Sequence, residues 1–226
     1  MVKCQRISDS GHWTPARTFA PSASTHSRHL VLVTGFPASG KTLVGLSAVH
    51  NRAPDDLAVE RAGGKPTSPA IFLSGNGPPV QVLQYELRSA GGGKTFVRDV
   101  KNYVKQYLGD SKAKLPQHVV AYDEVQRAWD LEQITARQSL PFPKSKPEAF
   151  VDCGQRIPGW CVLVGLIGSG QEIHVGEEAG LGQWRTALEK AGDPGGWTVL
   201  SASSRPDPSF DATAARLQWH GVKMLD

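Results

Sequence analysis

The fold is decided by the stretch Val31-Leu32-Val33-Thr34-Gly35-Phe36-Pro37-Ala38-Ser39-Gly40-Lys41-Thr42. An apolar run over Leu30–Val33 precedes the first glycine, and a segment that predicts a helix over Lys41–His50 follows the loop. The loop has the pattern G-x-x-x-x-G-K-[ST], which between a buried strand and a helix is the phosphate-binding P-loop. The sequence therefore predicts a nucleoside triphosphate site. The alternative interpretation is a glycine-rich bend with an exposed lysine.

Each residue type in this loop suits a phosphate ligand. Two glycines permit the backbone angles that turn successive N–H groups inward as an anion nest. The helix that follows adds the positive end of its dipole. Lys41 is expected to reach the β- and γ-phosphates, and Thr42 to hold Mg²⁺ through its hydroxyl. The predicted nucleotide-binding residues are Gly35, Ala38, Ser39, Gly40, Lys41 and Thr42.

Composition indicates one globular core. The chain has 226 residues, of which 39% are hydrophobic and 20% charged, enough for a single domain. Its longest apolar run, Trp160–Ile167, is far shorter than the ~20 residues that span a bilayer. The first residues lack the apolar block of a signal peptide, and three widely spaced cysteines predict neither a disulfide framework nor a zinc ribbon. We expect a cytoplasmic protein without membrane contact.

Strands and helices alternate along the chain, which predicts an α/β fold with a parallel sheet. Residues 1–28 are polar and predict a flexible lead-in or a truncated upstream region, 29–201 a P-loop NTPase domain, and 202–226 an irregular tail. Predicted strands are Leu30–Val33, Ala70–Leu73, His118–Tyr122, Trp160–Val164 and Trp197–Ser201. Predicted helices are Lys41–His50, Pro79–Ala90, Arg98–Leu108, Asp123–Asp130 and Glu177–Ala191, with loops at Asn51–Ser68 and Ser139–Pro147.

Two further segments supply polar groups where a nucleotide site needs them. Asp123 and Glu124 follow an apolar run, and the carboxyl edge of a parallel sheet is where such folds bind ligands. Asp123 is expected to bind Mg²⁺ and Glu124 to activate the attacking water as general base. The alternative is a solvated helix N-terminus. After the strand that begins at Trp160, Gln171 is a candidate for sensing the γ-phosphate, unless it is a surface residue of a glycine-rich turn.

Together these motifs resemble the Schlafen group-3-like DNA/RNA helicase family, which belongs with the superfamily 1 helicase-like ATPases. The resemblance extends from about Leu30 to Trp184 and includes Phe72–Pro78, Phe96–Val100, Asp123–Trp129 and Gly165–Trp184. It implies a RecA-like sheet flanked by helices in three αβα layers, with ATP and Mg²⁺ as ligands. It also implies that Gln126 and Arg127 link the state of the bound nucleotide to nucleic-acid binding, and that Ser74 and Asn76 contact the nucleic-acid strand.

The chain departs from this family pattern in two respects. Superfamily 1 proteins usually have Asp three residues before the glutamine of the third motif, where this chain has Gly168. A working helicase also needs a second RecA-like lobe, in cis or in trans, that brings arginines to the γ-phosphate. An arginine finger is worth roughly 10³–10⁵ in rate. We therefore expect a single lobe that binds ATP and hydrolyses it slowly without separating strands.

A basic segment provides a candidate path for nucleic acid. The segment from Lys94 to Lys114 contains six basic and two acidic residues. Its net charge of +4 equals the net charge of the whole chain. On a helix over Arg98–Leu108, Arg98, Lys101 and Lys105 would project opposite an apolar stripe, with Tyr103 and Tyr107 available for base stacking. The partner would be single-stranded DNA or RNA, whereas the alternative is a solvated helix face. Two functions remain open: the ATPase lobe of a nucleic-acid motor, and a nucleotide-binding switch with little turnover.

Overall fold

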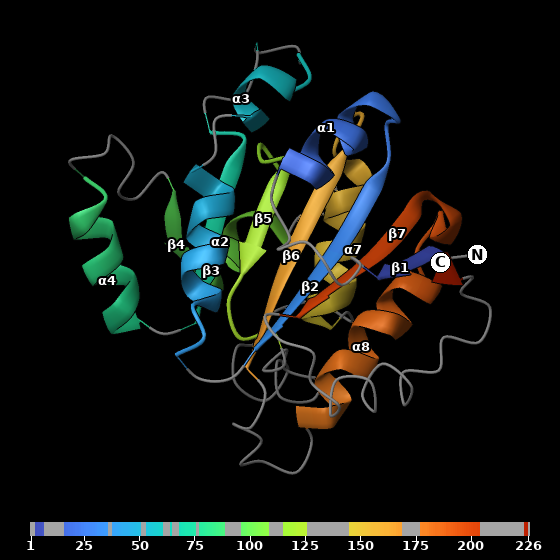
Figure 1. Ribbon diagram of the computed structural model, residues 1–226. Helices are drawn as coiled ribbons and strands as arrows, with labels where there is room; N and C mark the ends of the chain where they lie inside the picture. The colour runs from blue at the N-terminus through green and yellow to red at the C-terminus, as the bar shows by residue number, and fades with distance from the viewer. Residues whose placement is uncertain are drawn as a thin grey trace.

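One parallel sheet organises the computed structural model (Figure 1). The structure describes residues 3–6, 16–35, 38–50, 53–60, 64, 68–75, 77–88, 96–108, 115–125, 145–168, 177–203 and 224–225. In these residues eight strands lie in the order β4-β3-β5-β6-β2-β7-β1-β8, and every pairing between neighbours is parallel. The strands are β1 (Lys3–Arg6), β2 (Arg28–Gly35), β3 (Ala70–Ser74), β4 (Val97–Asp99), β5 (Val119–Tyr122), β6 (Cys161–Gly168), β7 (Trp197–Ser203) and β8 (Met224–Leu225).

Helices connect these strands and cover both faces of the sheet. They are α1 (Ala16–Ser24), α2 (Lys41–His50), α3 (Ala53–Leu57), α4 (Gly77–Glu86), α5 (Val100–Tyr103), α7 (Lys146–Arg156) and α8 (Glu177–Glu189). A π-helix, Val104–Leu108, continues α5, and a short 3₁₀ helix, Pro194–Gly196, precedes β7. Figure 1 shows α2 in front of the sheet and α7 behind it.

The strand period of two sends alternate side chains to opposite faces. In β2, Leu30 belongs to a core cluster that includes Phe150 of α7 and Trp184 of α8. Val31, the next residue, belongs to the other cluster, with Phe19 of α1 and residues of α2 and α4. Strands buried on both faces read as continuous apolar runs, as this one does. The arrangement confirms the predicted fold: a single RecA-like lobe of three αβα layers.

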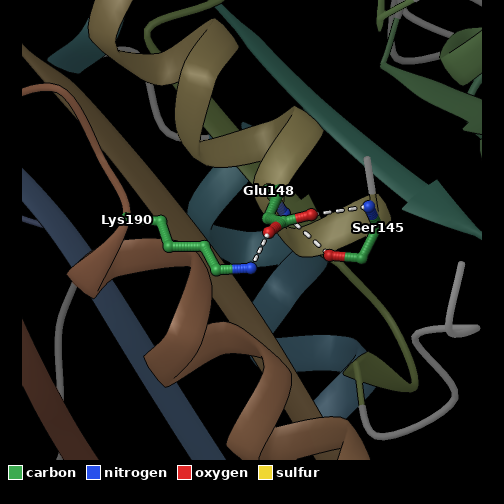
Figure 2. A network of polar contacts seen from close by, with 3 residues as sticks. All are labelled: Ser145, Glu148 and Lys190. Carbon is green, nitrogen blue, oxygen red and sulfur yellow. Dashed lines mark hydrogen bonds and ion pairs between the residues drawn. The ribbon is translucent and has the colours of Figure 1, made fainter. Parts of the chain in front are cut away.

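A polar network joins α7 to the end of α8 on the second face. Ser145 caps α7 with a capping box: its backbone N–H donates to Glu148 Oε2 at 2.8 Å, and its hydroxyl accepts from the Glu148 N–H. Lys190 Nζ donates to Glu148 Oε1 at 3.0 Å, so one carboxylate serves both helices (Figure 2). Burial alone would raise the pKa of Glu148, but the bonds from Ser145 and Lys190 outweigh it and hold the pKa below its ordinary value.

All five predicted strands are present, as β2, β3, β5, β6 and β7, and the helix over Lys41–His50 has the predicted bounds. The predicted helix over Arg98–Leu108 is wrong at its start. Arg98 and Asp99 belong to β4, and Asp99 caps the helix, its carboxylate accepting from the Asn102 N–H at 3.0 Å. The predicted Asp123–Asp130 helix lies mostly outside the described residues.

Several elements lie where the sequence predicts no regular structure. The strand β1 and the helix α1 fall in the expected lead-in, and α3 falls in the expected loop Asn51–Ser68. The strand β8 falls in the expected tail. The strand β1 has no apolar run to mark it in the sequence, and its backbone pairs with β7 and β8. The helix α7 was also missed, although Ser145-Lys-Pro-Glu148 is a capping box with proline at the helix start.

Candidate nucleotide-binding site

The predicted phosphate loop joins β2 to α2. Gly35 ends β2 and pairs with Gly168 of β6, and Lys41 begins α2. Between them, Ala38 has φ 60° and Gly40 has φ 87°, so the chain turns through left-handed angles directly before the helix. A Cβ on Gly40 would meet no atom within 4 Å, so the backbone angle, and not space, requires glycine there. Phe36 and Pro37 lie outside the described residues.

Close packing holds α2 against the sheet. A Cβ on Gly45 would lie 2.7 Å from Leu166 Cδ1 and 2.8 Å from Phe72 Cε2, both in fully buried side chains. Only glycine lets the helix approach β3 and β6 this closely. This role of Gly45 was not predicted, although a glycine inside an apolar helix is a signal of close packing. The contact places the N-terminal end of α2 at the loop.

The side chain of Lys41 bonds to the end of β2, the strand that precedes the loop. Lys41 Nζ donates to the carbonyl oxygen of Gly35 at 2.7 Å. Desolvation by burial lowers the pKa of Lys41, while the charges of Asp123 and Glu124 act to raise it. Ser39, Gly40 and Thr42 are exposed at the start of α2. The helix end therefore presents backbone N–H groups, a hydroxyl and an ammonium group at one place.

The predicted acidic pair follows β5 directly. The Asp123 N–H donates to the Leu73 carbonyl at 2.9 Å, which ties the end of β5 to β3. Both carboxylate residues are half-buried, and Glu124 has φ 56°. A positive φ in a residue other than glycine is strained and occurs often at functional sites. Val125 is buried against Gly165, where a Cβ would lie 2.9 Å from Val125 Cγ2. This packing fixes the turn that carries the two carboxylates.

The loop and the acidic pair come from strands that are not neighbours. The strand β6 lies between β2 and β5, and Gly165 of β6 pairs with both Leu32 and Tyr122 (Figure 1). Since all the strands are parallel, the carboxyl ends of β2, β6 and β5 share one edge of the sheet. Lys41, Asp123 and Glu124 lie within electrostatic reach of one another there. Gln171 lies outside the described residues, but β6, the strand that precedes it in the chain, ends between β2 and β5.

The remaining predicted residues are only partly described. Ser74 is buried at the end of β3, and Asn76 lies outside the described residues, as do Gln126 and Arg127. Lys101 and Lys105 are exposed, as the sequence predicts, and Arg98 is half-buried.

The predicted stacking role of Tyr103 is wrong. Its side chain has 0% exposure, and its hydroxyl donates to Gln117 Oε1 at 2.8 Å inside the core. Burial raises the pKa of the Tyr103 phenol well above its ordinary value. A base cannot stack on a ring that the core covers on both sides.

Oxygen donors at the site suit a hard divalent cation. In the described ranges, His, Cys, Asp and Glu form no cluster of three or more that could hold a metal ion. Mg²⁺, however, commonly binds through one or two protein oxygens and the phosphates of its substrate. The hydroxyl of Thr42 and the carboxylate of Asp123 are donors of that kind, so the residues fit a magnesium ion that arrives with a nucleotide.

These features define the class: a RecA-like α/β domain with a glycine-rich loop and an acidic pair at the carboxyl edge of its sheet. The family model for Schlafen group 3, DNA/RNA helicase domain, matches residues 28–213. The chain therefore belongs to this family, and the match agrees with the resemblance that the motifs carry. Comparison with curated proteins gave no match. Among the described residues, no helix has the length and apolar character to cross a bilayer.

Proposed function

We propose that this helicase-type domain binds ATP with Mg²⁺ at the carboxyl edge of its sheet and hydrolyses it slowly, under the influence of single-stranded nucleic acid. One observation carries the proposal: the loop after β2 and the acidic pair after β5 lie at the same carboxyl edge of the sheet, on either side of β6, and the charges of Asp123 and Glu124 act on Lys41. A cation and two carboxylates around a helix N-terminus provide the groups that phosphoryl transfer requires.

In this proposal each residue has a defined task. Loop N–H groups and Lys41 hold the phosphates, and Lys41 leaves the Gly35 carbonyl to do so. Thr42 and Asp123 hold Mg²⁺, which neutralises charge on the phosphate oxygens. Glu124 accepts the proton of the attacking water, and Gln171 senses the γ-phosphate.

Nucleic acid would bind beside this site. Arg98, Lys101 and Lys105 would contact phosphates of the nucleic-acid strand, and Asn76, which follows β3 in the chain, would contact it as well. Gln126 and Arg127, which follow the acidic pair in the chain, would couple the two ligands. A second RecA-like lobe, in cis or in trans, would supply the arginines that full turnover requires.

Nucleotide binding is tested with a fluorescent ATP analogue and Mg²⁺. Lys41→Ala should abolish binding, because it removes the cation that meets the β- and γ-phosphates. Lys190→Ala is the matched control, since it removes a lysine that follows α8 and bonds Glu148, away from the loop. ATP affinity that survives Lys41→Ala would show that the site is assigned wrongly.

Turnover is measured as phosphate release with and without a 20-mer of deoxythymidine or uridine. Glu124→Gln keeps the shape of the side chain but removes the base, so turnover should fall roughly 10²–10⁴-fold while ATP still binds. Glu189→Gln, on the exposed part of α8, is the control. Stimulation by either 20-mer supports the motor interpretation, and binding with a flat, slow rate supports a nucleotide-controlled switch.

A further inference from the structure

The guanidinium of Arg98 is held from two sides. Arg98 Nη2 donates to Gln106 Oε1 at 2.5 Å. The Arg98 Cζ atom also lies 5.7 Å from the centroid of the Tyr103 ring and 5.8 Å from that of the Tyr107 ring. The two rings are 4.9 Å apart, so together they form an aromatic support beneath the cation. Contacts at these distances are attractive cation–π interactions.

Two of these three partners come from the π-helix, and Tyr103 comes from the last position of α5. Gln106 and Tyr107 both belong to Val104–Leu108, the segment in which the chain widens from an α-helix to a π-helix. Short π-helical turns of this kind occur frequently at functional sites. Arg98 itself belongs to β4, the strand at one edge of the sheet. The aromatic support of Arg98 is thus built from α5 and the π-helix, which directly follow β4 in the chain.

The restrained cation still has donors to offer. A guanidinium has five N–H groups in a planar fork, and within the described residues Gln106 accepts from one of them. Lys101 and Lys105, which follow Arg98 in the chain, are exposed and add positive charge to this segment. Asp99, the nearest acidic residue in the chain, directs its carboxylate to the N–H of Asn102 at the helix start.

A fixed guanidinium is a better ligand for phosphate than a mobile one. An arginine side chain loses rotamer freedom when it binds, and less is lost when the fork is already oriented. Phosphodiester oxygens match the planar fork in charge and geometry. Because Tyr103 is buried, a nucleobase cannot stack on its ring, but the ring is a rigid support for the Arg98 cation.

We propose that Gln106 and Tyr107 are positioning residues that hold Arg98 ready for a phosphate of single-stranded nucleic acid. This inference rests on the proposed nucleic-acid function of the basic segment, and it adds two residues and a mechanism to it. The strand is recognised at this point through its backbone, without regard to base sequence.

The test measures binding of fluorescent 20-mers of deoxythymidine and of uridine by anisotropy, from 50 to 300 mM KCl. Gln106→Ala should weaken affinity about 2- to 10-fold, the range expected when one long side chain must be ordered on binding. The slope of log K against log salt should stay unchanged, because every cation is still present. Arg98→Ala should weaken affinity and also reduce that slope by about one. Gln81→Ala, an exposed glutamine on α4, is the matched control.

A double-mutant cycle provides the decisive comparison. With Arg98 already replaced by alanine, Gln106→Ala should have no further effect, because Gln106 acts only through that arginine. Tyr107 gives an independent pair: Tyr107→Phe keeps the ring and should bind like the wild type, whereas Tyr107→Leu should weaken affinity. Thermal denaturation checks that each variant is folded.

The outcomes separate the inference from the function on which it rests. If the wild-type chain binds and Gln106→Ala behaves like Gln81→Ala, or if its effect adds to that of Arg98→Ala, the positioning role is overturned and the proposed function stands. If the wild-type chain binds neither 20-mer, the nucleic-acid function is overturned and the inference with it.

Discussion

The contact of α2 with the sheet gives the sharpest prediction, tested by Gly45→Ala. The added methyl group would lie 2.7 Å from Leu166 Cδ1 and 2.8 Å from Phe72 Cε2, closer than the 3.0 Å that real Cβ atoms keep. Both neighbours are fully buried, so neither can move aside into solvent. Helix α2 must therefore shift away from the sheet, and the phosphate loop at its N-terminal end must shift with it.

Two effects of opposite sign determine the size of the change. Overpacking a core by one methyl group costs about 1–3 kcal/mol. Replacing glycine by alanine inside a helix returns about 1 kcal/mol through propensity. The net loss in the free energy of unfolding should be about 0–2 kcal/mol. In a chain of this length, each kcal/mol lowers Tm by about 2–4 °C. ATP affinity should fall as well, because the loop is displaced.

Urea denaturation measures the stability, and a fluorescent ATP analogue measures the affinity. Gly192→Ala is the control: its Cβ would lie 3.7 Å from Gln155 Oε1, an ordinary contact, at an exposed position. That variant should be close to the wild type in both assays. A Gly45→Ala protein more stable than the wild type, with unchanged ATP affinity, would refute the argument that this glycine sets the position of α2.

Three further predictions concern charge and backbone strain. Glu148 has a folded-state pKa below its ordinary value of 4.5. Its bonds to Ser145 and Lys190 therefore stabilise the fold above pH 4.5, and this stabilisation is lost as acid protonates the carboxylate. The stability lost in Lys190→Met should shrink when urea denaturation is repeated at falling pH. Burial is the largest effect that lowers the pKa of Lys146, from 10.5 to about 8. Below pH 8 the folded state therefore carries this charge at a cost in stability, and the cost is lost as the pH rises from 8 to 10.5. The stability gained in Lys146→Met should decline over that range when urea denaturation is repeated at rising pH. Gly40→Ala should cost about 1–2 kcal/mol of stability because φ is 87°, and it should also weaken ATP binding in the fluorescence assay, whereas Gly64→Ala, at φ 90°, should cost stability alone.

Local patterns were sufficient for much of the fold. The apolar runs that became β2, β3, β5, β6 and β7 are buried on both faces, so each is continuous in the sequence and easy to find. Strand β4 was not found, because three residues carry too little pattern, and the cap at Asp99 looked like the interior of a helix. Strand β1 was not found for a different reason: Lys3-Cys4-Gln5-Arg6 has no apolar run, and only its pairing with β7 and β8 makes it a strand.

The candidate site divides in the same way. The loop from Gly35 to Thr42 could be recognised because its glycines, lysine and threonine lie within eight residues at fixed spacing, and their chemistry is local. By itself the sequence determined that loop, the acidic pair and the family. Only the tertiary structure decided that β6 separates β2 from β5, that Lys41 nevertheless lies within electrostatic reach of both carboxylates, and that Tyr103 supports Arg98 from inside the core. Strand order and burial depend on contacts between residues far apart in the chain, which no local pattern records.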